Sequence, residues 1–380
     1  MRTAVQRCGA LALCVVLLFC LLAGCTGHSG EKNWSELTPQ STTELKYAKQ
    51  FTIEDYGNGL QLITIAQDRQ YLLVPEGAQA PAGVPEEVTV LQQPIQNIYL
   101  TATAAMDLFR ALDGLDAIRL SGTKESGWYL PEAQQAMEAG NILYAGKYSA
   151  PDYELILAQQ CGLAVESTMI YHNPEVKEQL ESLGIPVLVD YSSYESDPLG
   201  RMEWIKLYGA LLGKEEEAAR IFDEEVAAVQ PVLNQTNTGK TVAFFYITNT
   251  GTVNVRKSGD YIAQLIRMAG GVYVPDNQNG DEKNALSTMN IDMESFYAAA
   301  HDADVLIYNS TIDGELASLD ELLKKSELLA DFKAVQNGEV WCTGKNMFQS
   351  SMSLGRMIQE INAVLTQQAP DGLTYLYRLS

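Results

Sequence analysis

The spacing of apolar residues divides the chain into stretches with different predicted structures. Between residues 51 and 74, apolar and polar residues form the strand-like runs FTIEDYGNGLQLITI and QYLLVPE, which indicate a β-hairpin. Asn58 and Gly59 lie within the first run, and this pair accepts the positive φ angles of a tight turn. From about residue 97, short apolar runs alternate with amphipathic stretches, as in NIYLT followed by AAMDLFRALDGL. This order predicts a parallel, doubly wound sheet.

The middle of the chain shows no strand pattern. It runs from DPLGRMEWIKLYGALLG through KEEEAARIFDEEVAAVQPVLNQ, and the second stretch has apolar residues at helical spacing. A helix of about 20 residues spans some 30 Å. Strand and helix alternation restarts at TVAFFYIT and continues to SLGRMIQEINAVL. The fold class is therefore α/β, with two doubly wound lobes joined by a single long backbone helix and a ligand cleft between the lobes.

The N-terminus has the order of an export signal. Arg2 and Arg7 accompany the apolar run ALALCVVLLFCLLAG, and Cys25 follows it. The run of about 15 residues is shorter than the roughly 20 that a membrane-spanning helix needs. The sequence LLAGC fits a lipoprotein signal in which Cys25 receives diacylglycerol and the chain is cleaved before it; a buried cysteine of a signal anchor is the alternative. We expect a lipid-anchored protein on the extracytoplasmic face of the cell membrane.

These patterns set the expected domain boundaries. Polar, Ser/Thr-rich residues follow Cys25 without a hydrophobic period, which is typical of a flexible tether. The expected parts are a signal peptide (1–24), the tether (25–46), an N-terminal lobe (47–213), a connecting helix (214–238) and a C-terminal lobe (239–380).

The net charge of the chain excludes some classes of binding partner. The formal net charge is −22, and it becomes −24 when Arg2 and Arg7 are removed with the signal. A body this acidic does not favour nucleic acid or anionic lipid surfaces. After processing, the cysteines left are Cys161 and Cys342, which are too few for a disulfide framework. We interpret both as small buried side chains.

Taken together, the lipidated tether, the two lobes and the single connecting helix resemble the helical-backbone class of ABC importer substrate-binding proteins, which bind siderophores, haem and cobalamin. The segment NIYLTATAAMDLFRALDGLD resembles the first strand and helix of that class. The segment GIPVLVDYSSYESDPLGRMEWIKLYGALLGKEEEAARIFDEEV resembles its entry into the backbone helix. The resemblance covers about residues 51–365. It implies ABC permease subunits and a small-molecule metal chelate as partners, no intrinsic cofactor and no catalysis; we expect a monomer.

The resemblance also implies two docking carboxylates. In the family, one Glu on each lobe docks into Arg pockets of the two permease subunits. PDYELILAQQCGLAVES places Glu154 in the first position, and NIDMESFYAAAHDADVLIY places Glu294 in the second. Two fixed carboxylates are recognised by two Arg forks only when the lobes hold the right separation. Ordinary solvated helix acids are the alternative in a chain with 48 acidic residues, and Cys161-Gly162 stands where the family usually has Pro-Asp.

Candidate ligand contacts are loop residues that follow strands, because ligands of open α/β sheets bind outside the carboxyl ends of the strands. Aromatic faces with Arg and Lys suit a large, flat, anionic ligand or a metal chelate. A ferric siderophore fits best and a tetrapyrrole second, although packing within its own lobe is the alternative for each aromatic. The candidates in the first lobe are Thr101, Thr103, Lys124, Trp128, Tyr129, Tyr171, His172, Tyr191 and Tyr194. Those in the second are Tyr246, Asn249, Arg256, Lys257, Asn309, Ser310, Lys345 and Phe348.

Other functions have weaker support. His172 suits a haem or cobalt ligand, with a surface histidine as the alternative. The chain has three histidines, one of them in the tether, which does not favour a zinc or manganese site, and we assign no direct metal ligand. An extracellular surface hydrolase is the enzyme alternative, but the sequence has no Gly-x-Ser-x-Gly, HExxH or P-loop motif. A structural surface lipoprotein without a ligand is the third possibility.

Overall fold

The structure is a computed structural model that describes residues 33–276, 288–370 and 372–380. The predicted signal peptide and Cys25 lie outside these residues. The chain divides into two compact units, Met1–Thr38 with Gln79–Glu86, and Pro39–Ala78 with Glu87–Ser380. In the first unit, the short helix η1 (Trp34–Glu36) follows Asn33, whose side chain accepts a hydrogen bond from the N–H of Ser35. All the sheets belong to the second unit.

The second unit begins with a five-stranded sheet in the order β1-β2-β3-β4-β5. Asn58 and Gly59 have φ angles of 54° and 79° and turn β2 into β3, which confirms the predicted hairpin. The short strand β1 pairs with β2, so residues 41 and 42 belong to a sheet and not to the expected tether. The strands are β1 (Ser41–Thr42), β2 (Phe51–Gly57), β3 (Leu60–Ile65), β4 (Arg69–Val74) and β5 (Val88–Gln92).

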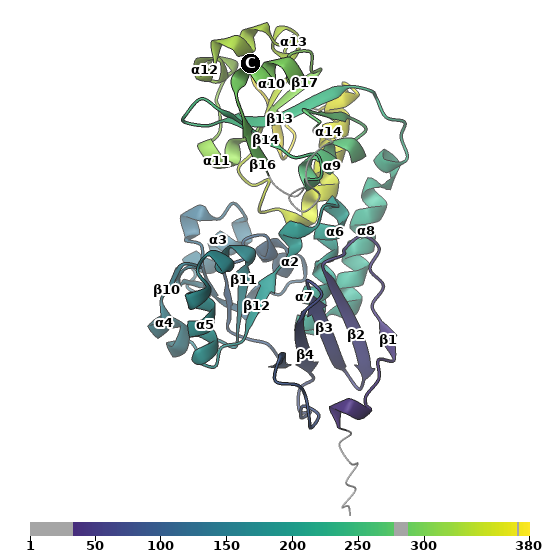
Figure 1. Ribbon diagram of the computed structural model, residues 1–380, viewed down its shortest axis with the longest axis vertical. Coiled ribbons are helices and arrows are strands. Elements are labelled where there is room, and N and C mark those ends of the chain that lie inside the picture. Colours follow the sequence, from purple (N-terminus) through teal and green to yellow (C-terminus); the bar gives the residue numbers. More distant parts are fainter. Residues whose placement is uncertain (1–32, 277–287, 371) are drawn as a thin grey trace, which may run out of the picture. The chain divides into compact units, whose positions relative to one another are not determined.

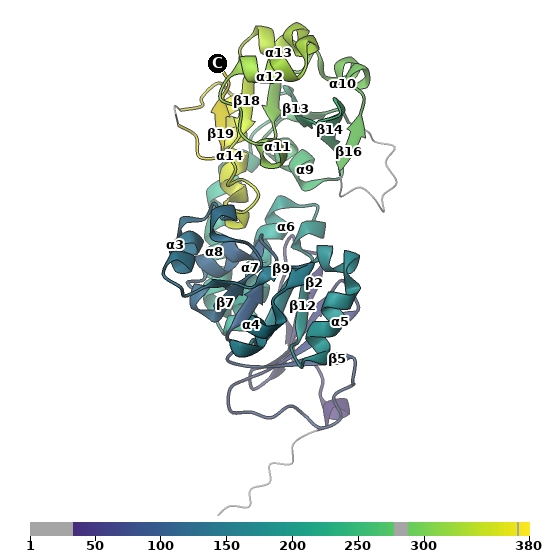
Figure 2. The same ribbon diagram turned by 90° about the vertical axis from the view of Figure 1, so that its left-hand side faces the viewer.

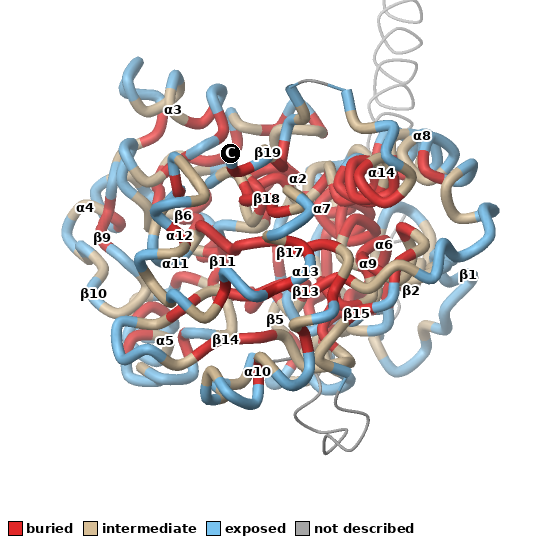
Figure 3. Tube along the Cα trace, turned by 90° about the horizontal axis from the view of Figure 1, so that it is seen from above, coloured by how far each residue is buried: buried red, intermediate tan, exposed pale blue. Residues whose placement is uncertain are grey.

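The second sheet is wholly parallel, as the alternating pattern predicts. Its strand order is β12-β11-β6-β7-β8; β6, β7, β11 and β12 are mostly buried, whereas β8 at the edge is partly exposed, and Figure 3 shows β6 and β11 in the buried interior. Figure 2 shows α4 and α5 in front of these strands. The strands are β6 (Ile98–Leu100), β7 (Ile118–Ser121), β8 (Leu143–Tyr144), β11 (Leu163–Ser167) and β12 (Val187–Asp190). The helices are α2 (Ala105–Ala111), α3 (Pro131–Glu138), α4 (Tyr153–Ala158) and α5 (Pro174–Ser182); β9 (Gly146–Lys147) and β10 (Ala150–Pro151) form a separate ribbon.

Three consecutive helices follow, with no strand between them. They are α6 (Pro198–Glu203), α7 (Ile205–Leu212) and α8 (Glu215–Leu233). Helix α8 has 19 residues and lies alongside α14 (Leu354–Leu365) (Figure 1). Ala218 and Phe222, two members of the predicted apolar stripe, are buried. No helix in the described ranges is long and apolar enough to cross a membrane.

The last sheet is mixed, with the order β16-β14-β13-β17-β18-β19 and β15 paired to β13. Strands β13, β15, β17 and β18 are parallel, while β14, β16 and β19 run antiparallel to their neighbours. The strands are β13 (Thr241–Ile247), β14 (Val253–Arg256), β15 (Val272–Val274), β16 (Thr288–Ile291), β17 (Val305–Tyr308), β18 (Val340–Thr343) and β19 (Leu376–Arg378). The helices are α9 (Tyr261–Met268), α10 (Met293–Ala300), α11 (Ser310–Asp313), α12 (Leu319–Lys325) and α13 (Lys333–Gln336). The α/β fold class with parallel sheets is confirmed.

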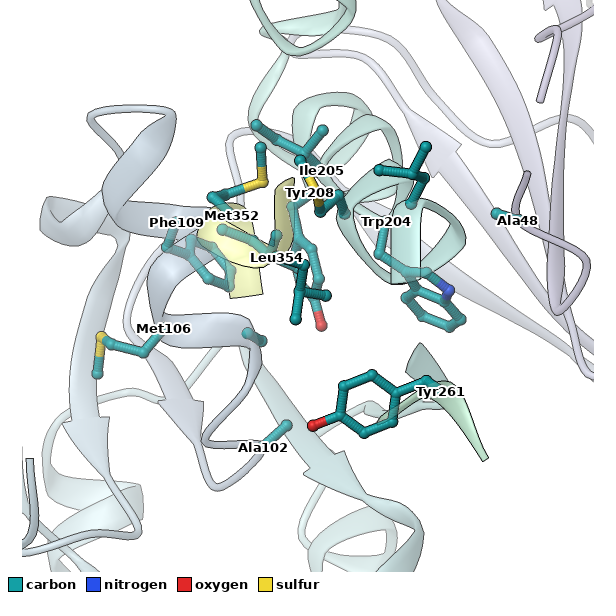
Figure 4. Packing of buried hydrophobic residues seen from close by; sticks show 14 of the residues in the cluster. Ala48, Ala102, Met106, Phe109, Trp204, Ile205, Tyr208, Tyr261, Met352 and Leu354 are labelled. Atoms are coloured by element: carbon teal, nitrogen blue, oxygen red, sulfur yellow. The ribbon is translucent and has the colours of Figure 1, made fainter. Parts of the chain in front are cut away.

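We call residues 39–78 and 87–213 the first half and residues 239–380 the second half. One hydrophobic cluster contains residues of both (Figure 4). From the first half, Phe109 and Tyr208 bring their rings to 4.9 Å, and from the second half Tyr261 and Leu354 join the same cluster. Both cysteines of the described chain are free thiols; Cys342 is buried, as predicted, whereas Cys161 is partly exposed.

Candidate ligand-binding site

A hollow of about 440 Å³ is lined by residues from both halves. From the first half come η5 (Ser192–Tyr194) and α6, and from the second half come the end of β14, the start of α9, α11 and the loop after β18. Two of its residues, Arg256 and Phe348, are among the sequence candidates. The lining residues are Ser193, Arg201, Arg256, Asp260, Tyr261, Thr311, Ile312 and Phe348.

Arg201 supplies the first cation of this hollow. Its Nη2 donates to the main-chain oxygen of Ser193 at 2.5 Å, and its Nε donates to that of Glu195 at 3.0 Å. Its Cζ lies 3.5 Å from the centre of the Tyr261 ring. Burial lowers the pKa of Arg201, against the opposing effects of Tyr261 and Asp260, but a guanidinium stays charged in proteins. Among the described residues, Arg201 forms no ion pair with an acid, so its charge is left for another partner.

Arg256 supplies the second cation. Its Cζ lies 5.2 Å from the ring centre of Phe348 and 5.8 Å from that of Phe244. Its Nη1 lies 3.7 Å from Oδ2 of Asp260, a buried residue that also caps α9. Asp260 therefore neutralises one of the two guanidinium groups in part. With two cations and one acid, the hollow attracts anions, and the aromatic rings leave it partly apolar.

Three predicted tyrosines form a cluster at the carboxyl ends of β11 and β12. The Tyr171 and Tyr191 rings are 6.2 Å apart, and the Tyr191 and Tyr194 rings are 5.3 Å apart. The hydroxyl of Tyr191 donates to that of Tyr171 at 3.1 Å, and burial raises the pKa of Tyr171. Arg69 of β4 lies over both Tyr171 and Tyr191, at 5.1 and 5.2 Å. Tyr171 and Tyr194 remain 38 % and 46 % exposed, which leaves ring faces for a flat ligand.

Trp128 corrects a sequence expectation. Its side chain has no exposed surface, and its indole N–H donates to the hydroxyl of Ser121 at 3.2 Å. It is a packing residue of the first half, with no face for a ligand. The next residue, Tyr129, is exposed, and its main-chain N–H donates to Oε1 of Gln349 at 2.7 Å. Because Gln349 also donates to the oxygen of Gly127 at 2.8 Å, one amide side chain links this loop to the second half.

The other first-half candidates lie apart from the lining of the hollow. Thr101 follows β6 and is partly exposed, and Thr103 is exposed just before α2. Nζ of Lys124 lies 5.6 Å from the ring centre of Tyr144, the last residue of β8. His172 is exposed at the end of η4 (Thr168–His172), a position compatible with a metal-complex ligand and with an ordinary surface histidine.

Several second-half candidates have structural partners. Asn309 caps α11, and Ser310 donates its hydroxyl hydrogen to the main-chain oxygen of Thr343 at 2.5 Å. Lys345 lies 3.7 Å from Oε2 of Glu315, in a surface ion pair. The remaining candidates, Tyr246, Asn249 and Lys257, lie on β13, in the following hairpin turn and after β14, and none lines the hollow.

Arg201 and Tyr261 are the main residues that sequence reasoning missed. The search covered loop residues that follow strands, whereas Arg201 lies inside α6 and Tyr261 begins α9. Asp197 is the N-cap of α6, and its side chain accepts a hydrogen bond from the N–H of Leu199. The Asp-Pro pair at 197 and 198 is a helix-start signal, and it was the available clue that Arg201 lies in a helix.

Glu154 and Glu294 occupy matching local structures. Each follows an Asp that caps its helix, Asp152 for α4 and Asp292 for α10, and each is exposed in the first turn. The caps accept from main-chain N–H groups at 3.0 and 2.6 Å. Neither Glu forms an ion pair with another described residue. The shared geometry fixes where each carboxylate emerges from the surface, as a docking contact requires.

Comparison with known families decides the class of the chain. Residues 101–347 match the periplasmic binding protein family. The chain belongs to that family. Its place is therefore among binding proteins and not among enzymes. An uncharacterized lipoprotein of Methanocaldococcus jannaschii is 25 % identical over 96 % of this chain and 94 % of its own length.

Solved structures share the fold of this periplasmic binding protein. The periplasmic heme binding protein HutB of Vibrio cholerae superposes with a TM-score of 0.57 at 19 % identity, over 72 % of this chain and 99 % of that chain. An ABC-type Fe3+-hydroxamate transport system protein of Saccharomonospora viridis gives 0.53 at 21 % identity, over 70 % and 92 %. The resemblance derived from sequence is thereby confirmed at the level of family and fold.

Proposed function

We propose that this protein captures an anionic iron chelate, of the ferric siderophore type, outside the cell and delivers it to an ABC importer. The observation that carries the proposal is the hollow in which Arg201 and Arg256 each lie over an aromatic ring. Guanidinium groups fixed in this way bind anionic oxygens with directed hydrogen bonds, and the rings accept a flat apolar body. The similar solved proteins named for heme and Fe3+-hydroxamate agree with a ligand of this kind.

A tetrapyrrole is the second candidate. The exposed ring faces of Tyr171 and Tyr194 favour it, because a haem or cobalamin needs more flat surface than a small chelate does. Either ligand arrives with its own metal, so the protein has to recognise only the periphery of the complex.

We also propose how the protein is held and how it docks. The signal and Cys25 give an N-terminal lipid anchor on the extracytoplasmic face, in keeping with the name of the lipoprotein relative. Helix α8 is the connection between a lobe at 47–213 and a lobe at 239–380. Glu154 and Glu294 are the contacts to the two permease subunits, and a single copy of the chain is sufficient for this arrangement.

The test is a fluorescence titration of the full chain in mild detergent with ferric catecholate and hydroxamate siderophores, haem and cobalamin. Trp204 is a suitable reporter, because its indole N–H donates to Glu195, whose main-chain oxygen accepts from Arg201. Arg201→Gln should weaken binding about tenfold to a hundredfold, since it removes hydrogen bonds to a charged group. Arg220→Gln, on an exposed part of α8, is the matched control. Equal affinity of Arg201→Gln and the native chain for every compound that binds, or no binding of any compound, would refute the proposal.

A further inference from the structure

The first parallel sheet has one point at which the chain order reverses. After β6, the chain adds β7 and β8 on one side, and it then returns to add β11 and β12 on the other side. The reversal therefore lies between β6 and β11. In open α/β sheets, the crevice at the carboxyl ends of the strands that flank such a point is the usual place for a ligand. Here those ends carry Thr101, just after β6, and Glu166, near the end of β11.

Glu166 is a buried carboxyl group with an incomplete set of partners. The residue has no exposed surface. Its Oε2 accepts a hydrogen bond from the hydroxyl of Thr101, and its Oε1 has no hydrogen-bond partner in the described structure. A buried carboxylate is ordinarily stabilised by a cation or by several donors. With one neutral donor, the ionised form of Glu166 is poorly compensated.

The titratable groups around Glu166 do not supply a positive charge. They are Tyr99 on β6, Tyr153 on α4 and Cys161 before β11. Burial raises the pKa of each, to about 11 for Cys161, so all three are neutral at pH 7. Burial also raises the pKa of Glu166 to about 7, against the opposing effect of the Thr101 hydrogen bond.

The neighbouring strand β12 does not compensate Glu166 either. The residue that pairs with Glu166 in register is Val189. Next along β12, Asp190 receives hydrogen bonds from the Tyr208 hydroxyl at 2.5 Å and the Ser192 N–H at 2.8 Å. Successive residues of a strand point to opposite faces of the sheet, so the Asp190 carboxylate belongs to the other face. Any charge on Glu166 therefore remains without a cation.

Thr101 is held in place beside this carboxyl group. A Cβ atom on Gly122 would lie 2.8 Å from Cγ2 and 3.0 Å from Cα of Thr101, so the glycine lets the two chains approach closely. The main-chain N–H of Thr101 donates to the main-chain oxygen of Val165 at 2.9 Å. The Thr101 hydroxyl has a second acceptor within reach, the same Val165 oxygen at 3.4 Å. The side chain is thus fixed, while its hydroxyl hydrogen has two alternative acceptors.

We propose that Glu166 is a proton-binding site that sets the direction of the Thr101 hydroxyl at the switch point of the wholly parallel sheet. When the carboxyl is neutral, it donates its own hydrogen to Thr101 Oγ1, and the Thr101 hydroxyl donates to the Val165 oxygen. When the proton leaves to solvent, the Thr101 hydroxyl donates to the carboxylate. The hydrogen bonding of this edge therefore depends on pH near neutrality, whichever ligand the protein binds.

The experiment is infrared spectroscopy of the full chain, in mild detergent, as a function of pH. The native protein should show the carbonyl band of a neutral, buried carboxyl group that disappears with a midpoint of about 7. Glu166→Gln should remove this band, whereas Glu178→Gln, an exposed residue on α5, should leave it unchanged. Thr101→Val should move the midpoint upward, because it removes the hydrogen bond that favours the charged form.

Three results would overturn the proposal. They are the absence of a titrating band, a band that survives Glu166→Gln, and an unchanged midpoint in Thr101→Val. If Glu166→Gln fails to fold, uniform ¹³C labelling of glutamate shifts the band and assigns it to a Glu carboxyl, and the Thr101→Val midpoint then decides the identity of the residue.

Discussion

The parallel sheet of the first half and the mixed sheet of the second half each have a switch point in strand order, and different side chains lie at the two points. In the second half, the order reverses between β13 and β17. The N–H of Asn309, which follows β17, donates to the main-chain oxygen of Phe245 on β13 at 2.7 Å. In the first half, the N–H of Thr101 makes the corresponding bond to Val165 at 2.9 Å. The backbone solution is thus shared, and the side chains make the difference.

The second switch point contains neutral groups that satisfy one another. The amide oxygen of Asn309 accepts from the N–H and the hydroxyl of Thr311 at 3.2 and 2.6 Å. The hydroxyl of Ser310 donates to the Thr343 oxygen. At the first switch point, Glu166 has one donor for two carboxylate oxygens. The proposed titration of Glu166 therefore makes the edge of the sheet β12-β11-β6-β7-β8 pH-dependent, whereas these neutral side chains of the sheet that contains β13 and β17 carry no charge that changes with pH.

The largest expected effect on the free energy of unfolding is that of replacing Glu203, a buried carboxylate that has several hydrogen-bond donors. Glu203 is as buried as Glu166, but it accepts from the N–H groups of residues 46–48 and from Lys206 Nζ at 2.7 to 2.9 Å. Glu203→Ala removes this acceptor from the three N–H groups and leaves the Lys206 ammonium group with only the main-chain oxygen of Glu44, at 2.9 Å. We expect a loss of about 3–5 kcal/mol in the free energy of unfolding, measured by urea denaturation. Glu216→Ala, on the exposed face of α8, should change it by less than about 0.5 kcal/mol; equal effects of the two would contradict the argument.

Glu166→Gln, in contrast to Glu203→Ala, should raise the free energy of unfolding above neutral pH. The pKa of Glu166 is raised from 4.5 to about 7 in the folded chain, so the folded state holds the proton more tightly than the unfolded state does. This contribution to stability is fully present below pH 4.5 and is lost as the pH rises through 7. Relative to Glu166→Gln, the native chain should therefore lose about 3 kcal/mol between acid and alkaline pH. Urea denaturation over this range checks it, and parallel pH profiles of the two proteins would exclude the switch.

Some elements of the fold could be predicted from the sequence, whereas several residues of the candidate sites could not. The hairpin, the parallel strands and the long helix follow from apolar periodicity, because each element buries its own apolar side chains. In the sequence, Glu166 stands at the end of the apolar run GLAVES and gave no signal of a site, and Trp128 was expected in a ligand-binding loop. Their burial depends on strands and helices that are distant in sequence, such as β6 and α4 around Glu166. Arg201 was missed for the same reason, since only the fold brings α6 next to Tyr261.

At the second switch point, Asn309→Ala should have a modest effect that does not vary with pH. The substitution removes the side chain that caps α11 and accepts from Thr311. The loss of an N-cap costs about 1 kcal/mol, and no charge appears or disappears with it. Urea denaturation at pH 5 and pH 8 should give the same difference from the native chain. A difference that changes with pH would show that this edge, too, contains a group titrating near neutrality.

The smallest expected effect on stability belongs to the two exposed carboxylates. Glu154 and Glu294 lie in the first turns of α4 and α10, where a negative charge interacts favourably with the helix dipole by less than about 1 kcal/mol. The double substitution to Ala should therefore leave the unfolding free energy and ligand affinity almost unchanged, while uptake by cells is abolished. Glu178→Ala, also exposed and on α5, should preserve uptake. Weakened ligand binding with normal uptake would contradict the docking assignment. The same charge that is unfavourable at the buried Glu166 is tolerated by the fold at these exposed positions, because water compensates it.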